Sequence, residues 1–157
     1  MLKLIYDNPL NKMPIQQFVI FLIRISIGIF FFTTGFNKLF VEKNKLIMLE
    51  TIIDAGIPFP EIMSTFVSTT EMLAGLFLLL GLLTQLSSIL LFIICLTALY
   101  TIGIHTIPNG LDLISWFSWF FYTHDLLYMF LLALLITSRP SILSLDRILN
   151  TKINLSS

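Results

Sequence analysis

The chain has 157 residues, of which 57% are hydrophobic and 11% charged, and its formal net charge is zero. Soluble domains carry about 25% charged residues, and a mean hydropathy of +0.95 excludes an ordinary water-soluble surface. We therefore predict an integral membrane protein in contact with lipid, with room for one domain over residues 1–157. No basic tract is present, so nucleic acid is not an expected partner.

Cysteine usage limits the redox chemistry of the chain. Its single cysteine, Cys95, lies in an apolar run, which excludes an internal disulfide, a CxxC pair and a cysteine-ligated cluster within one chain. Cys95 is predicted to be an inert core residue. The sequence predicts no metal site and contains no recognisable cofactor-binding motif. Arg24 interrupts the first apolar stretch and no small-x-small cleavage site follows, so we expect that stretch to be retained as an anchor.

The first predicted membrane span covers residues 15–39, which is long enough to cross a hydrocarbon core of about 30 Å. The polar run 42–45 is expected to end it. Residues 46–55 place apolar side chains on one side and acidic ones on the other, a pattern typical of a helix that lies on the membrane surface. Gly56 is expected to cap this helix in a left-handed conformation, and Pro58 prevents its continuation.

The remaining spans follow from one long uncharged segment and one aromatic segment. Residues 72–111 contain no charged side chain, but a helix of that length would measure about 60 Å, so the chain must fold back, most simply at 81–85. This predicts spans at 64–83 and 86–103, and the aromatic segment supplies a fourth at 118–138. The predicted fold is all-α: a four-helix transmembrane bundle with an interfacial helix between spans 1 and 2.

The distribution of basic residues predicts the orientation. Four spans place both termini on one side, and positively charged residues favour the cytoplasm. A short surface helix is expected near residues 142–152. We therefore predict a multi-pass protein with cytoplasmic termini, from the bias between Lys3, Lys12, Arg139, Arg147 and Lys152 on one side and Lys38, Lys43 and Lys45, among several acids, on the other.

A stripe of charged and small residues runs along the first span. Arg24, Gly28, Phe31, Gly35 and Lys38 fall within about 80° on one face of a helix. One interpretation is that the charges snorkel to the interface while the glycines permit close helix packing. The other is that the stripe lines a polar site inside the bundle.

Two acidic residues lie in predicted spans. Glu71 belongs to the second span, and a carboxylate in hydrocarbon needs a partner, a proton or water. Lys38 and Arg24 are both candidate partners, and the sequence does not decide between them. Asp125 either belongs to the same group of interacting charges or marks a late start of the last helix at the water interface. We predict an intramembrane polar network of Arg24, Lys38, Glu71 and Asp125, which could fix helix packing or form a proton or substrate site.

Aromatic residues gather between positions 116 and 122, just before His124 and Asp125. Such a cluster is typical of the aromatic belt at a membrane interface. It could also form a flat pocket for a quinone headgroup, lined by His124, Trp119 and Tyr128. Axial haem binding by two histidines has no second signature and is not favoured.

The order of these motifs resembles the DoxX family of small bacterial membrane proteins over about residues 18–146. The resemblance rests on the stripe from Arg24 to Leu39, on Gly56–Pro60, on the segment from Glu71 to Thr84 and on the ending Arg139–Asp146. It departs from the family at His124–Asp125, where a glutamate would be expected.

The resemblance implies a four-helix protein of the bacterial inner membrane. The family includes subunits of a thiosulfate:quinone oxidoreductase and proteins associated with other membrane redox assemblies, but its signature assigns no reaction. The leading hypothesis is a subunit or accessory of a quinone-linked membrane redox complex, with redox subunits as partners. The alternatives are a structural or assembly protein whose charges only fix packing, and a small-solute or proton transporter. Whether the chain forms a homo-oligomer is left open.

Overall fold

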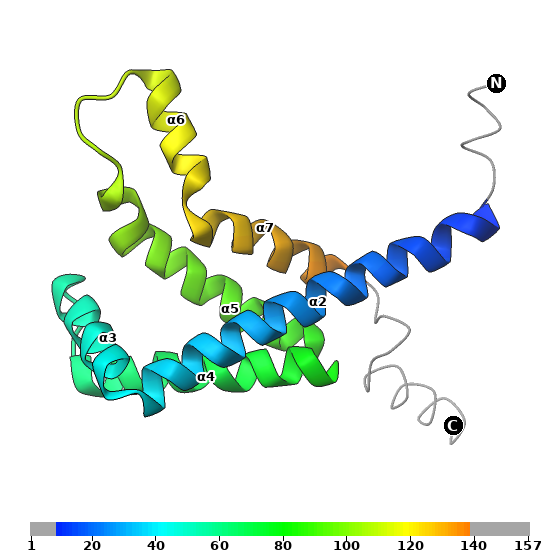
Figure 1. The fold of residues 1–157 in the computed structure, drawn as a ribbon, viewed down its shortest axis with the longest axis horizontal. Coiled ribbons are helices and arrows are strands. Elements are labelled where there is room, and N and C mark those ends of the chain that lie inside the picture. The colour runs from blue at the N-terminus through cyan, green and yellow to red at the C-terminus, as the bar shows by residue number, and fades with distance from the viewer. Residues whose placement is uncertain (1–8, 139–157) are drawn as a thin grey trace.

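The structure is a computed structural model and describes residues 9–138, with side chains from Ile15 onward. The predicted surface helix at 142–152 and the ending at Asp146 lie outside these residues. The described part consists of helices and connecting turns (Figure 1). In chain order these are α2 (Pro9–Phe40), α3 (Glu42–Asp54), α4 (Pro60–Leu80), α5 (Thr84–Ala98), the π-helix η1 (Leu99–Gly103), the 3-10 helix η2 (Ile104–Thr106), α6 (Leu113–Tyr122) and α7 (His124–Thr137).

Three helical segments are long and apolar enough to cross a membrane: Ile15–Phe40, Pro60–Leu80 and Thr84–Thr106. They overlap the first three predicted spans. A fourth crossing is available if α6 and α7 are taken together as one bent segment. The all-α membrane fold predicted from the sequence is therefore confirmed.

The region of the fourth predicted span, 118–138, is not one continuous helix. The helix is interrupted at Thr123, which has extended backbone angles. The axes of α6 and α7 are bent by 62° relative to each other at this point. By itself α7, with 14 residues, is only about 21 Å long. Figure 1 shows α6 turning away from α5 and α7 at this break. An acidic residue, Asp125, lies in the first turn of α7, where its charge favours the start of a new helix.

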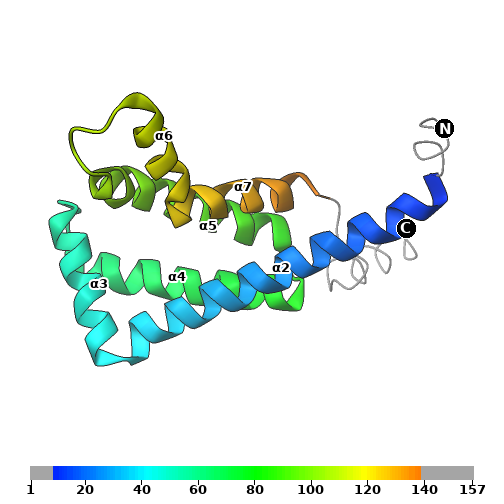
Figure 2. The ribbon, with the colours of Figure 1, turned by 45° about the horizontal axis from the view of Figure 1, so that its top comes forward.

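Helix α3 lies across one end of the bundle, beside the ends of α2 and α4 (Figures 1 and 2). It begins earlier than predicted, because the polar run 42–45 forms its first turn and only Val41 separates it from α2. Met48 and Ile52 are buried beneath it. A helix that buries only one side at the bundle end fits the predicted interfacial position.

Two glycines end α3 and α4 in the same way. Gly56 and Gly81 have φ angles of +68° and +66°, which favour glycine. After α3, the Gly56 amide donates to Ile53 O at 2.9 Å and the next amide reaches back to Ile52 O at 3.2 Å. This double closure satisfies carbonyls that the helix end would leave open. The turn at Gly81 then sends α5 back along α4 (Figure 2).

The closest helix contact joins α2 to α4. A Cβ atom placed on Gly35 would lie 2.5 Å from the Met72 amide nitrogen and 2.7 Å from Ser68 O, so only glycine fits. Gly75 on α4 faces the backbone of Phe32 in the same manner. Small residues of this kind let membrane helices approach closely. The adjoining core cluster consists of Ile27, Phe31, Ala74, Leu78, Leu91, Cys95, Leu132 and Leu135.

Candidate functional site

An ion pair between α2 and α4 lies at the centre of the candidate site. Lys38 Nζ is 2.7 Å from Glu71 Oε2 and donates to Glu71 Oε1 at 2.9 Å. The Glu71 side chain is 6% exposed, whereas that of Lys38 is 30% exposed. The close approach at Gly35, one turn before Lys38, brings the two groups together. Of the two partners that the sequence left open for Glu71, the structure places Lys38 in contact with it.

Arg24 lies far from this pair. It is buried, with 2% exposure, and its guanidinium carbon is 5.4 Å from the centroid of the Phe21 ring. Both Arg24 and Lys38 belong to the continuous helix α2, which separates them by about 21 Å along its axis. Because Gly28 on α2 faces Leu79 on α4, Arg24 lies near the level of the turn at Gly81. The two charges of the stripe therefore occupy opposite ends of the bundle.

A cavity of about 140 Å³ opens beside the ion pair, and we call it the inner cavity. Helices α2, α4, α5 and α7 all contribute to its wall. One part of the wall carries the ionisable groups of Lys38, Glu71, His124 and Asp125. The complete lining is Phe30, Phe31, Thr34, Lys38, Glu71, Ile94, Cys95, Ala98, His124, Asp125 and Tyr128.

Aromatic rings form another part of the wall. Tyr128 stacks on Phe30, with ring centroids 4.3 Å apart and an angle of 25° between the ring planes. It also meets Phe31 edge-on, with centroids 5.6 Å apart. These contacts join α2 to α7 and hold the phenol of Tyr128 at the cavity. The inner cavity thus combines flat rings with groups that can donate or accept protons.

Asp125 reaches the cavity from the first turn of α7. Its Oδ2 atom would lie 3.7 Å from a Cβ atom placed on Gly103, the last residue of η1. Thus α7 starts next to the π-helical end of the third span. Short π-helical segments occur frequently at functional sites. The break at Thr123 therefore places Asp125 and His124 at the cavity wall.

The structure separates the three residues predicted for a quinone pocket. His124 and Tyr128 line the inner cavity. Trp119 is not in its lining, is 49% exposed and belongs to α6, which the break at Thr123 directs away from the bundle. The predicted grouping of Trp119 with His124 and Tyr128 therefore differs from the lining of the inner cavity, because the helix breaks at Thr123.

Several cavity residues were missed by the sequence interpretation. Cys95 is buried, as predicted, but it also contributes to the cavity wall. Phe30 lies outside the stripe that was singled out on the first span, although its ring packs on Tyr128. Its position on the helix gives no signal for this contact, which depends on where α7 docks. Among residues 9–138, no group of three or more His, Cys, Asp or Glu side chains could hold a metal ion.

Comparisons with known proteins agree with this description at the level of the family. The comparison with curated proteins gave no match, and neither did the comparison with solved structures. The family model described as DoxX matches residues 19–104, which include α3, both partners of the Lys38–Glu71 pair, the second spanning segment and most of the first and third. Since this match covers more than half of the chain, the protein belongs to the DoxX family of membrane proteins.

Proposed function

We propose that the protein binds the headgroup of a quinone in the inner cavity, as a subunit or accessory of a redox complex in the bacterial inner membrane. The observation that carries this proposal is the composition of the cavity wall. Stacked rings of Phe30 and Tyr128 stand near four ionisable side chains inside an apolar bundle. A quinone headgroup is a flat ring with two carbonyl oxygens, so it needs both kinds of surface.

The size of the cavity supports a single six-membered ring. An apolar cavity of about 150 Å³ in another protein holds benzene, and the inner cavity measures about 140 Å³. Aromatic walls favour an offset-stacked or edge-on ring. Phe30 is partly exposed on the outside of the bundle, so a ring carried by a lipid-soluble tail could enter between α2 and α7.

The ionisable groups supply the proton chemistry that a quinone requires. Reduction of a quinone to a quinol consumes two electrons and two protons, and oxidation of the quinol returns them. His124 and Asp125 can exchange protons with the ring oxygens, and the Lys38 ammonium can donate a hydrogen bond to one of them. A partner redox subunit supplies or accepts the electrons, since the chain has one cysteine and no cofactor motif of its own.

A structural function is the second candidate, and one observation favours it. The Lys38–Glu71 pair crosses the same interface at which Gly35 and Gly75 bring α2 and α4 together. Polar contacts between membrane helices can serve packing alone. In that case the charges would fix the helix arrangement, and the cavity would hold only water.

Gentle purification from native membranes separates these functions. Bound quinone after solvent extraction, together with copurified redox subunits, is expected for the first function. A pure protein without quinone, equally stable with and without added quinone, would support the structural one.

A matched pair of variants on α7 tests the pocket itself. Tyr128→Leu removes the ring that stacks on Phe30, so it should weaken binding of a short-chain quinone about fivefold, in line with about 1 kcal/mol for an aromatic pair. Phe130→Leu is the control, because Phe130 is 59% exposed on the same helix and does not line the cavity. Equal affinities for the two variants would place quinone binding elsewhere.

A further inference from the structure

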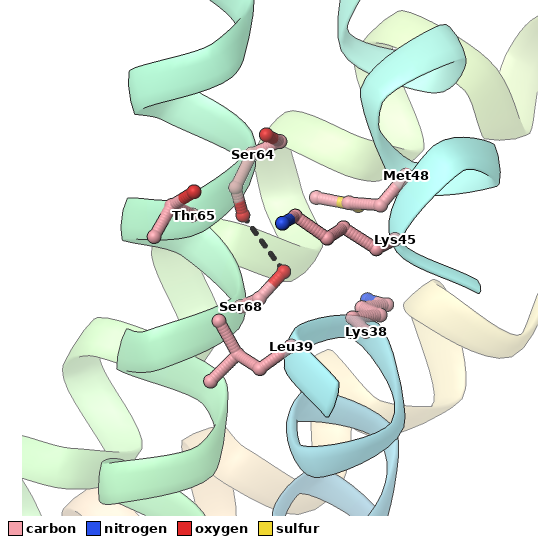
Figure 3. A pocket seen from close by; sticks show the side chains of 7 residues that line it. All are labelled: Lys38, Leu39, Lys45, Met48, Ser64, Thr65 and Ser68. Carbon is pink, nitrogen blue, oxygen red and sulfur yellow. Dashed lines mark hydrogen bonds between the residues drawn. The ribbon is translucent and has the colours of Figure 1, made fainter. Parts of the chain in front are cut away.

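A second hollow adjoins the ion pair on the side of α3, and we call it the outer pocket. It measures about 120 Å³ and lies between α2, α3 and α4. Figure 3 shows its side chains, among which the Lys45 ammonium points toward the hydroxyl-bearing face of α4. The lining consists of Lys38, Leu39, Lys45, Met48, Ser64, Thr65 and Ser68.

The polar groups of this pocket line up toward the ion pair. Ser64 and Ser68 are buried, with 7% and 1% exposure, and they occupy successive turns of α4. The Ser68 hydroxyl donates to Ser64 O at 2.7 Å (Figure 3). Glu71 follows Ser68 by almost one further turn of the same helix, and its carboxylate holds Lys38.

Lys38 lines both hollows, the outer pocket and the inner cavity. Lys38 therefore stands where the two hollows meet, and Glu71 lines the inner cavity alone. A site holds a water molecule when it offers about 10–15 Å³ and two or more polar partners. Both hollows exceed this volume several times, and each has polar groups in its wall. At the other end of the pocket, Lys45 and Thr65 are exposed.

We propose that the outer pocket is a water-filled passage from the α3 side of the membrane to the Lys38–Glu71 pair, and that the pair closes it off from the inner cavity. Small aqueous species reach the pair through the passage, and only protons cross the pair by transfer through its carboxylate and ammonium groups. This last step rests on the proposed quinone function, because a quinone site must exchange protons with water. The passage itself requires no quinone.

Thiol labelling with silver ion tests the passage directly. Silver ion is small, soluble in water and reactive toward thiols, and leaky membrane vesicles expose both faces of the protein to it. The single native cysteine, Cys95, is 2% exposed and lines the inner cavity, so the wild-type protein reports access beyond the ion pair. A Cys95→Ser/Ser68→Cys protein reports access to the outer pocket, on the α3 side of the ion pair, at a position with 1% exposure.

The proposal expects the Ser68→Cys protein to react about tenfold or more faster than wild type, although both positions are equally buried, because thiol reactivity follows access. Cys95→Ser/Thr65→Cys serves as a second reporter, since Thr65 lines the pocket and is exposed. Cys95→Ser/Ala74→Cys gives the background rate, because Ala74 belongs to the core cluster.

Reaction at Ser68→Cys and Thr65→Cys, with Cys95 and Ala74→Cys both slow, supports the passage and its closure. A background rate at Ser68→Cys, even with fast reaction at the exposed Thr65→Cys, would overturn the passage. Equal fast rates at Ser68→Cys and Cys95 would overturn the closure by the pair. The rates at Ser68→Cys and Thr65→Cys do not depend on quinone, because neither residue lines the inner cavity, so a failure of the passage differs from a failure of the proposed function.

Discussion

Replacing the partners of the Lys38–Glu71 pair one at a time should give unequal losses of stability. Lys38→Ala leaves a carboxylate whose side chain is only 6% exposed, whereas Glu71→Ala leaves an ammonium that is 30% exposed and can reach water. Breaking a buried pair costs about 3–5 kcal/mol in soluble proteins, but polar contacts between membrane helices average about 0.6 kcal/mol. We expect about 2–3 kcal/mol for Lys38→Ala and about 1–2 kcal/mol for Glu71→Ala.

The double variant isolates the interaction from these losses. Lys38→Ala with Glu71→Ala should cost about 1–2 kcal/mol less than the sum of the single losses, because it leaves neither charge behind. Thermal unfolding in detergent resolves this, since 1 kcal/mol shifts the midpoint of a domain of this size by about 2–4 °C. Glu71→Gln should cost less than Glu71→Ala, because the amide keeps the shape and can accept a hydrogen bond.

Arg24 provides the control cycle. It lies about 21 Å from Lys38 along α2, so Arg24→Ala and Glu71→Ala should be additive within about 0.5 kcal/mol. Additivity in the Lys38–Glu71 cycle would refute the coupling deduced from the 2.7 Å contact. Coupling of Glu71 to Arg24 would contradict the register of α2 against α4.

Two further outcomes follow from the helix packing and the topology. Gly35→Ala forces the two backbones apart at the α2–α4 contact and should lower the free energy of unfolding by about 1–3 kcal/mol. The control Ser26→Ala, at an exposed position of the same helix, should change that free energy little. Equal effects of the two variants would disprove the close contact. Reporter fusions at Gln85 and Asn109 should mark the cytoplasmic and the outer face respectively, and a reporter at Gln85 on the outer face would reverse the proposed orientation.

Sequence reasoning reached the membrane fold because its signals are local. Long uncharged runs predict the spans, and Gly56 and Gly81 each end a helix through bonds within a few residues, so both features could be predicted without knowing the packing. The partner of Glu71 could not be predicted in this way. Lys38 and Arg24 share one helix face, and only the register of α2 against α4, set by Gly35 and Gly75, decides which of them meets the carboxylate.

In the fourth predicted span, two sequence signals pointed to different structures: a long apolar run and a polar pair within it. The apolar run across Thr123 favoured one helix, and no proline or glycine interrupts it. The pair His124–Asp125 marked the start of a new helix, an alternative that the sequence left open and that the structure contains. The consequence for Trp119 could not be seen beforehand, because the direction of α6 depends on the backbone angles at a single residue.

Photolabelling with an azido-quinone tests the central claim most directly, because it asks where on the chain a quinone ring lies. After labelling in membranes, digestion and mass spectrometry would map the modified residues. Our account predicts labels on α2 between Phe30 and Lys38 and on α7 between His124 and Tyr128, and their loss when unlabelled short-chain quinone competes. Labels spread over the exposed outer residues of the helices, without competition, would contradict a quinone site in the inner cavity.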